Sequence, residues 1–489
     1  MTAFRVPLVI RGEVIEGDEV EFGGRDPATR FRGPDVARHL DRLPLSPPSA
    51  IADLHTISFD EMLDYLVELG ERLNFASNRH LQEALELTSR TSGLGRPILE
   101  AVYGNLGKVF NRSEMREMAD VLIGIPFLEG WVCTRCEGPS SSHVRAFGAR
   151  SLHVIAGNVP TISAITVLRN AITRSDMIVK TPSNDPLTMI AIARTMIDMA
   201  PDHPLTRHVS VGYWKGGDER IERRLYQPAN VEKIIAWGGL ASVQHISKYL
   251  QPGIDLITLD PKLSATIIGA EAFADEAAMR ECARRAALDV GVNNQQACLN
   301  ARVIHVHTGT DAAGLAKANR FGELLFAAIQ QLPATLSNAV PALDPELAEE
   351  VEGLRYAAGL YRTFGGDGRG GVVVSQGDEP VEFSPLLSGR VANVVPIDSL
   401  DTAIGAVTSW TQTIGLYPDR LMHDLRDRLA FQGAQRLVTL GCATRRTIAG
   451  PQDGIEVLRR MCKWILNEVH EDDPTAIWQD RAELAATAS

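Results

Sequence analysis

The interpretation of this sequence depends on one stretch, Gly291-Val292-Asn293-Asn294-Gln295-Gln296-Ala297-Cys298-Leu299. It places a cysteine in a run of amides and small residues, directly before an apolar run, 301–306, that predicts a strand. A thiol there can attack a carbonyl group when nearby donors stabilise the oxyanion that forms. The alternative is a buried structural cysteine, because free cysteine is among the most buried residue types. The sequence on either side favours the nucleophile.

Upstream of this stretch, strands and helices alternate from residue 152, which predicts an α/β fold. The expected strands cover 152–156, 176–180, 208–212 and 231–237, and the expected helices cover 161–173, 187–199 and 242–250. This order is typical of a doubly wound nucleotide-binding unit, in which ligands lie at the carboxyl ends of the strands. Those ends hold Gly157-Asn158, Lys180 and Gly238-Gly239.

A second α/β region is expected from about residue 254. Its predicted strands cover 254–259, 265–268, 301–306, 372–375 and 390–395, and its helices cover 274–288, 311–330, 400–413, 419–431 and 455–467. The glycine-rich run 365–371 lacks the Lys-Ser/Thr of a phosphate-binding loop, so we interpret it as a hairpin or flexible loop. We therefore predict an N-terminal helical segment plus a dinucleotide-binding domain over 1–253, a catalytic domain over 254–445, and a C-terminal helix and tail over 446–489.

The N-terminal segment is expected to be mostly helical. Residues 4–24 alternate apolar and polar as in an edge hairpin, residues 25–50 read as a loop, and helical patterns follow at 60–73, 78–90, 97–108 and 112–123. A hairpin arm is predicted at about 130–150, where Cys133 and Cys136 form a C-x-x-C. That motif can be a redox pair or half a zinc site, but no second pair follows, so we interpret the cysteines as unrelated and predict no metal.

Composition limits the function classes. The chain has 489 residues, 45% hydrophobic and 22% charged, which suits a globular protein of two or three domains. A net charge of −12 without a long basic run argues against nucleic acid as a partner. No apolar stretch reaches the ~20 residues that span a bilayer, and no signal peptide is evident. Six cysteines are too few for a disulfide framework, so we expect a reducing cytoplasm.

Taken in order, these pieces resemble the aldehyde dehydrogenase superfamily, and within it the bacterial acyl-CoA reductases of the bioluminescence fatty acid reductase type. The resemblance runs from about residue 6 to residue 467. It rests on Gly157-Asn158-Val159-Pro160, Lys180 with Pro182-Ser183, Trp237-Gly238-Gly239, Asn294-Gln295-Gln296-Ala297-Cys298, and Pro451-Gln452-Asp453-Gly454. It implies an aldehyde dehydrogenase-like fold with two doubly wound α/β domains and a small β-hairpin oligomerisation arm, and hence a homo-oligomer.

The resemblance also implies roles for single residues. Cys298 resembles the superfamily nucleophile, and Asn158 the amide that forms the oxyanion hole with the Cys298 backbone N–H. Lys180 resembles the lysine that hydrogen-bonds the adenosine ribose, and Gly238 and Gly239 match the turn that receives the pyrophosphate at a helix N-terminus. The alternatives stay open: a turn-forming Asn158, a solvated Lys180 and a plain strand-to-helix turn.

Two departures from the superfamily pattern are informative. Where hydrolytic aldehyde dehydrogenases carry the glutamate of Glu-Leu-Gly-Gly, this chain has Thr258-Leu259-Asp260-Pro261. Threonine cannot act as a carboxylate base near neutral pH, so an acyl-enzyme should persist, although Asp260 is a possible substitute. The glutamate of Glu-Ile-Phe-Gly-Pro is also replaced, by Leu386-Leu387-Ser388-Gly389-Arg390, which leaves Glu382 as a candidate for the nicotinamide ribose.

The sequence therefore predicts an acyl-CoA reductase that forms an aldehyde through an S-acyl-Cys298 enzyme. NADPH is favoured over NADH because the neutral donors Thr181, Ser183 and Asn184 follow Lys180, although the carboxylate of Asp185 weakens this argument. The substrate is expected to be an acyl-CoA or an acyl-protein, and the resemblance implies an acyl-protein synthetase as partner. The alternatives are an oxidising aldehyde dehydrogenase, an acyl-carrying subunit of a reductase complex, and a catalytically inactive relative.

Overall fold

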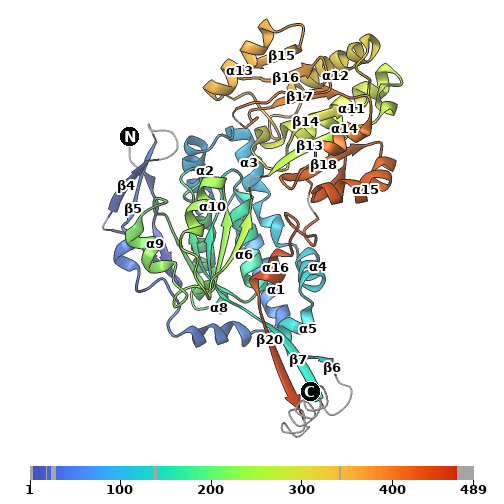
Figure 1. Cartoon of the computed structure of the whole chain (residues 1–489). Helices are drawn as coiled ribbons and strands as arrows, with labels where there is room; N and C mark the ends of the chain where they lie inside the picture. The colour runs from blue at the N-terminus through green and yellow to red at the C-terminus, as the bar shows by residue number, and fades with distance from the viewer. Residues whose placement is uncertain are drawn as a thin grey trace, which may run out of the picture.

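Two seven-stranded sheets organise the molecule, each at the centre of its own lobe, and a narrow arm extends from one of them (Figure 1). The computed structural model describes residues 4–17, 19–23, 29–135, 140–260, 262–340, 343–384, 386–445 and 447–470. Within these ranges, no helix is long and apolar enough to cross a membrane. No group of three or more His, Cys, Asp or Glu side chains in the described part of the chain could hold a metal ion.

The first sheet has the order β12-β11-β8-β9-β10-β2-β3. Its strands are β8 (Arg150–Val154), β9 (Asp176–Lys180), β10 (Val209–Gly212), β11 (Lys233–Trp237), β12 (Asp255–Leu259), β2 (Leu8–Ile10) and β3 (Glu13–Ile15). Its connections include α6 (Thr161–Ile172), α7 (Thr188–Met199), α8 (Pro204–Arg207), α9 (Glu219–Leu225) and α10 (Leu240–Ser247). β8 to β12 are parallel, and the antiparallel β2–β3 hairpin extends the sheet beyond β10. Every residue of β8 is buried, as expected for a parallel strand covered on both faces.

One strand joins a different sheet from the one predicted. Residues 254–259 are predicted to belong to the second region, but β12 pairs with β11 over five residues in the first sheet. The chain changes sheets between Leu259 and Leu263, where β13 begins. Apolar periodicity identified the strand correctly but carries no information about which neighbour it pairs with. The predicted domain boundaries remain predictions.

The second sheet has the order β15-β16-β17-β14-β13-β18-β19. Its strands are β13 (Leu263–Ile268), β14 (Ala301–Val306), β15 (Tyr361–Asp367), β16 (Gly370–Ser375), β17 (Val391–Pro396), β18 (Thr411–Tyr417) and β19 (Arg436–Thr439). Its helices are η4 (Ala270–Phe273), α11 (Glu276–Gly291), η5 (Val292–Gln295), α12 (Ala312–Gln330), α13 (Pro345–Tyr356), α14 (Leu400–Gly405) and α15 (Arg420–Gln432). The glycine-rich run is the turn of the β15–β16 hairpin, one of the two predicted alternatives. The helix predicted over 400–413 is too long, because α14 ends at Gly405 and β18 begins at Thr411.

The N-terminal part is mostly helical, as predicted. It contains β1 (Phe4–Arg5), β4 (Glu19–Gly23), β5 (Arg30–Pro34), η1 (Val36–His39), η2 (Pro48–His55), α1 (Phe59–Arg72), α2 (Arg79–Thr91), α3 (Arg96–Gly104), η3 (Leu106–Phe110), α4 (Arg112–Leu122) and α5 (Ile125–Glu129). β1, β5 and β4 form a small separate sheet. Ser58 and Glu61 form a capping box at the start of α1, whose apolar stripe is buried in the main core.

The arm is a three-stranded sheet of β6 (Val132–Arg135), β7 (Ser140–Phe147) and β20 (Lys463–His470). Figure 1 shows β20 lying along β7, far from the second lobe. The helix predicted over 455–467 is wrong beyond Met461, because α16 (Val457–Met461) gives way to β20. Pairing with β7 over eight residues overrides the local helical pattern. Cys136 lies outside the described residues, and Cys133 is disulfide-bonded, so the interpretation of the two cysteines as unrelated is not confirmed.

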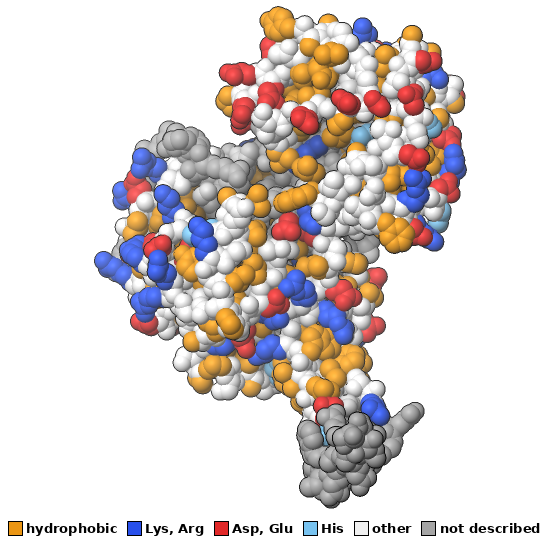
Figure 2. Space-filling view, in the orientation of Figure 1, with side chains coloured by type: hydrophobic (Ala, Val, Ile, Leu, Met, Phe, Trp, Pro, Cys, Tyr) orange, Lys and Arg blue, Asp and Glu red, His pale blue; other side chains and the backbone are white. Residues whose placement is uncertain are grey.

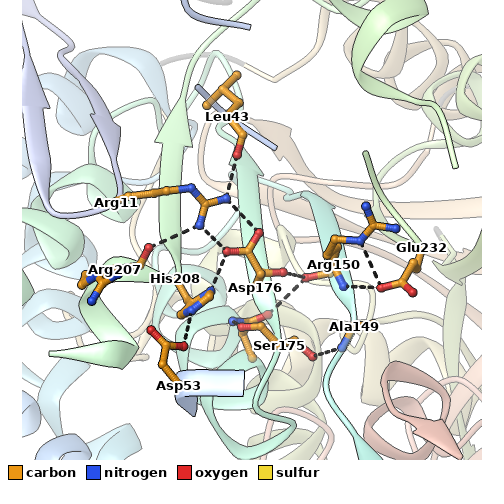
Figure 3. Close-up of polar contacts among 12 residues, drawn as sticks. Arg11, Leu43, Asp53, Ala149, Arg150, Ser175, Asp176, Arg207, His208 and Glu232 are labelled. Atoms are coloured by element: carbon orange, nitrogen blue, oxygen red, sulfur yellow. Dashed lines mark hydrogen bonds and ion pairs between the residues drawn. The ribbon is translucent and has the colours of Figure 1, made fainter. Parts of the chain in front are cut away.

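A buried polar network fastens the hairpin β2–β3 to the first sheet at the end opposite the expected ligand site (Figure 3). The Asp176 carboxylate, at the start of β9, accepts hydrogen bonds from Arg11 at 2.6 and 3.1 Å. His208 lies between two carboxylates, with Nδ1 2.8 Å from Asp176 and Nε2 2.6 Å from Asp53. Although burial would raise it, the pKa of Asp176 is lowered because His208 and Arg11 are hydrogen-bonded to its carboxylate.

Candidate functional site

The loop that carries Cys298 has an unusual backbone. Asn293, Asn294 and Gln295 have φ values of 53°, 50° and 62°, in the left-handed region that few residues other than glycine adopt. Such a conformation costs about 1–3 kcal/mol per residue and persists only where the surroundings fix it. Gln295 supplies part of that support, because its Nε2 donates to the carbonyls of Ala301 and Val391 and its Oε1 accepts from the Val391 N–H. Hydrogen bonds from Gln295 therefore fix the backbone conformation of the loop.

Neutral polar side chains hold the rest of the loop. Asn300 Oδ1 accepts from the Ala297 N–H at 3.0 Å, and its Nδ2 donates to the Val292 carbonyl at 3.1 Å. On β13, Ser264 Oγ donates to the Cys298 carbonyl at 2.7 Å. Ser264 and Asn300 are not predicted from the sequence, because their contacts are made to main-chain atoms and leave no spacing signal. Cys298 itself is half-buried, so its side chain is partly accessible.

Asn158 lies against this loop from the other lobe. It follows β8, and its Nδ2 donates a 2.9 Å hydrogen bond to the carbonyl of Gln296, two residues before Cys298. The turn is held closely, because Asn184 Nδ2 donates to the Gly157 carbonyl, and a Cβ on Gly157 would lie 2.3 Å from Asn184 Oδ1. The structure thus brings the two predicted catalytic residues to one place between the lobes, and Figure 2 shows a hollow between the lobes on the visible face.

Lys180, at the end of β9, is the central residue of the expected cofactor site. Its Nζ lies 5.9 Å from the ring centre of Tyr213 and 5.8 Å from that of Trp214. Loss of hydration lowers the pKa of Lys180 to about 8, and the negative charge of Glu222 on α9 opposes that shift. Glu222 is buried and accepts from the Gly217 N–H at 3.1 Å, and its Oε2 lies 2.6 Å from His245 Nε2 on α10. This arrangement joins the ends of β9 and β10 to α9 and α10.

The remaining predicted cofactor residues differ in accessibility. Ser183 is partly exposed in the turn after β9, whereas Thr181 is fully buried and both its N–H and its hydroxyl bond to the Gly212 carbonyl. Thr181 is therefore placed to hold the strand end. Gly238 and Gly239 precede α10, and Gly239 is its N-cap without a side-chain hydrogen bond to the helix. The first N–H groups of α10 are thus available to an anionic group, which fits the pyrophosphate of a dinucleotide.

The residues singled out because they depart from the superfamily pattern are partly or fully accessible: Thr258 and Asp260 in the first lobe, and Glu382 in the second. Thr258 is half-buried in β12, where it pairs with Ala236 of β11. Asp260, just beyond β12, is also half-buried, and Glu382 is exposed on the segment before β17.

A C-terminal segment, Pro451-Gln452-Asp453-Gly454, connects the lobes. Gln452 Oε1 accepts a 2.7 Å hydrogen bond from Arg169 on α6, and Gln412 on β18 donates to the Asp453 carboxylate. Arg169 in turn stacks over Trp237, the last residue of β11, at 5.4 Å. Both lobes are therefore tied to one short segment.

Comparison with known proteins gives one consistent picture. The family model of acyl-CoA reductases (LuxC) matches residues 54–464. A long-chain acyl-protein thioester reductase from Photorhabdus laumondii is 31% identical over 340 residues, which are 67% of this chain and 65% of that protein. The protein of the same description from Vibrio harveyi is 23% identical over 474 residues, 95% of this chain and 93% of the relative. The chain thus spans 65% of the Photorhabdus protein's length.

Solved structures show the fold. Lactaldehyde dehydrogenase from Escherichia coli superposes with a TM-score of 0.71 at 15% identity, over 96% of this chain and 100% of that one. The NADP-dependent glyceraldehyde-3-phosphate dehydrogenase from Bacillus halodurans, complexed with NADP, gives 0.69 at 12% identity, over 96% and 100%. The predicted fold class, aldehyde dehydrogenase-like α/β, is confirmed.

Proposed function

The chain belongs to the acyl-CoA reductase (LuxC) family, and from this we propose that it reduces an acyl thioester to an aldehyde with NADPH, through an acyl group carried on Cys298. The observation that carries the proposal is the contact of Asn158 with the loop of Cys298, made from the opposite lobe at 2.9 Å. It brings a side-chain amide beside a partly exposed thiol, which is what acyl transfer requires.

The chain's own groups account for acylation. The Cys298 thiolate attacks the thioester carbonyl, the carbon–sulfur bond of the substrate breaks, and the leaving thiolate takes a proton. The Asn158 amide nitrogen carries two hydrogens, of which the bond to Gln296 uses one, so the other can stabilise the oxyanion with the Cys298 N–H. Each such donor lowers the barrier by about 3–4 kcal/mol.

The acyl-enzyme then needs an exit other than hydrolysis. Thr258 stands where hydrolytic relatives of the superfamily carry a glutamate. Near neutral pH a threonine hydroxyl cannot act as the general base that a glutamate carboxylate provides. We infer that the thioester on Cys298 survives until it is reduced. A nicotinamide cofactor supplies the hydride for that reduction when bound. This argues against the first alternative, an enzyme that oxidises aldehydes to free acids.

The residues that would hold this cofactor are Lys180, Ser183 and the turn Gly238-Gly239. The uncapped N-terminus of α10 suits the pyrophosphate, and Lys180 suits the adenosine ribose. Ser183 is neutral, so it does not repel a 2′-phosphate, which is why we propose NADPH and regard NADH as the weaker cofactor.

The substrate is proposed to be a long-chain acyl thioester. The relatives from Photorhabdus laumondii and Vibrio harveyi are described as long-chain acyl-protein thioester reductases. The donor is therefore an acyl-CoA or an acyl group on a partner protein such as an acyl-protein synthetase. A chain that only carries acyl groups within a complex would be acylated but would not consume NADPH.

The test is intact-protein mass after incubation with a panel of acyl-CoAs. We expect a retained acyl adduct that is absent in Cys298→Ser and disappears on adding NADPH, with aldehyde released. Cys442→Ser, which removes another partly exposed thiol, is the matched control and should keep the adduct. An adduct in Cys298→Ser, or its conversion to free acid without cofactor, would contradict the proposal. An adduct that NADPH does not clear would favour the acyl-carrying role.

The arm is proposed to mediate self-association. Its exposed large apolar side chains are Trp131, Ile465, Leu466 and Val469, between 43% and 55% exposed. Figure 2 shows hydrophobic side chains gathered at the base of the arm. We expect Leu466→Asp to shift the molecular mass in solution toward the monomer, whereas Val121→Asp, on α4 outside the arm, leaves it unchanged. Light scattering after size exclusion distinguishes these outcomes, and a wild-type monomer would refute the proposal.

A further inference from the structure

A buried cation lies directly behind the Cys298 loop. Arg302 is the second residue of β14, and only 6% of it is exposed. Its guanidinium donates to three main-chain carbonyls: Nε to Leu387 at 3.1 Å, Nη1 to Asn300 at 2.9 Å and Nη2 to Ala297 at 3.5 Å. Among the described residues, no carboxylate lies within salt-bridge distance of it. The charge is therefore held by neutral dipoles alone.

Two of those acceptors flank Cys298 in the chain. Ala297 and Asn300 are the residues one before and two after Cys298, so Arg302 spans the turn that carries the thiol. Burial lowers the pKa of Arg302 to about 10, and the charge of Cys298 opposes this. The two side chains are thus close enough for the ionisation of one to affect the other.

We propose that Arg302 is a positioning residue that also supplies the counter-charge for the Cys298 thiolate. This rests on the proposed function only in taking Cys298 as the nucleophile. A guanidinium stays protonated in proteins, and a buried cation is costly unless it is compensated. When Cys298 releases its proton to solvent, the thiolate provides that compensation, so the same charge that is costly in the thiol form stabilises the reactive form.

The other groups that contact the loop do not supply this charge. Asn158, Ser264 and Asn338 reach it from the turn after β8, from β13 and from the segment before α13, and all three are neutral. The Asp289 carboxylate of α11 is turned to the N–H groups of Gly441 and Ala443, at 2.9 and 2.8 Å. Arg302 is therefore the group whose removal should change the ionisation of Cys298.

The test is the rate of Cys298 alkylation by iodoacetamide as a function of pH, in the full chain, read from the mass of the Cys298 peptide. Peptide-level detection separates it from Cys282, Cys442 and Cys462. We expect Arg302→Gln to move the titration midpoint upward and to slow alkylation at pH 7 about tenfold, because a neighbouring cation lowers a thiol pKa by at least ~1 unit. Arg302→Lys should retain most of the wild-type profile.

Ser264→Ala is the matched control, because it removes a hydrogen bond to the loop without changing its charge. It should leave the midpoint unchanged even if the rate changes at every pH. A wild-type midpoint at or above the ordinary ~8.5 would overturn the proposal, whether or not Arg302→Gln folds. So would an unshifted midpoint in folded Arg302→Gln.

The alkylation experiment needs neither acyl substrate nor cofactor. A midpoint that depends on Arg302 in a chain that forms no acyl adduct would therefore refute the proposed function and leave this proposal standing. An adduct on Cys298 with a midpoint independent of Arg302 would do the reverse.

Discussion

Asn158 and Gln296 are 138 positions apart in the chain, and the side-chain amide of the first donates to the main-chain carbonyl of the second at 2.9 Å. The bond joins the turn after β8 in the first lobe to the cysteine loop of the second. The amide is thus held against the cysteine loop by a contact that does not depend on substrate.

Replacing Asn158 by Ala should slow acylation of Cys298 at least about a hundredfold, because one oxyanion donor is lost. Pre-steady-state release of thiol from an acyl-CoA measures this step. Asn467→Ala, on the exposed face of the arm, controls for loss of an asparagine and should acylate normally. Acylation of Asn158→Ala at the wild-type rate, with an unchanged melting temperature, would show that the amide has no catalytic role.

Replacing Thr258 by Glu should turn part of the activity into thioester hydrolysis. The new carboxylate would stand where hydrolytic aldehyde dehydrogenases carry their base, and general bases contribute about 10²–10⁴-fold. Free acid released from an acyl-CoA without NADPH is the measurement, and we expect an increase at the lower end of that range. Thr258→Gln has the same shape without the base, so equal acid release by both variants would contradict the assignment.

Replacing Ser183 by Glu should favour NADH over NADPH. A carboxylate beside the ribose accepts a hydrogen bond from a free 2′-hydroxyl and repels a 2′-phosphate, so the KM for NADPH should rise about tenfold or more. The KM for the acyl substrate should stay unchanged. Ser183→Gln adds the same bulk without charge. If both variants raise the KM for NADPH equally, size and not charge is responsible.

Replacing Asp176 by Asn should destabilise the chain without touching the site. The carboxylate is buried and pairs with Arg11 and His208. Removing one partner of such a buried ion pair lowers the free energy of unfolding by about 3–5 kcal/mol. Asp255→Asn is the control, because its carboxylate is 39% exposed and pairs with Lys233 and Arg460 at the surface, where a pair contributes at most about 1 kcal/mol. Urea unfolding compares them, and equal losses would show that burial of the Asp176 network is unimportant.

Acid should destabilise the fold from near pH 6.5 downward. Burial lowers the pKa of His153 to about 3 and that of His305 to about 4, so the folded state keeps both rings neutral. The unfolded chain takes up these protons below pH ~6.5, so stability is complete above that pH and is lost as the pH falls toward 4. His305→Leu should flatten the fall of melting temperature between pH 7 and 5. A slope as steep as wild type would contradict this.

Much of the fold could be predicted because buried parallel strands leave a plain signal. β8, β9 and β11 are short, largely buried runs followed by glycine or ending at lysine, and the first lobe follows from them. Two errors concern strand pairing. β12 is predicted as a strand of the second region, but it pairs with β11, the strand before it. β20 is predicted as helix, but it pairs with β7, more than 300 positions earlier in the chain.

The sequence likewise predicts some residues of the candidate site and gives no signal for others. Cys298, Asn158 and Lys180 sit at the ends of recognisable elements, so their order along the chain predicted that they share a cleft. Ser264 and Arg302 donate to main-chain carbonyls of the cysteine loop, and such contacts leave no residue pattern. Thr181 was predicted as a cofactor contact from its neighbours, but its hydroxyl is bonded to the Gly212 carbonyl.

The packing of α16 and β20 on earlier strands affects how the chain folds during its synthesis. α16 packs on β11 and β12, and β20 pairs with β7, so residues 457–470 complete a surface begun much earlier in the chain. Until they leave the ribosome, the earlier lobe has an open apolar flank and β7 an unpaired edge, both of which invite aggregation. A premature stop codon before residue 457 would therefore leave apolar surface of the first lobe and the edge of β7 uncovered.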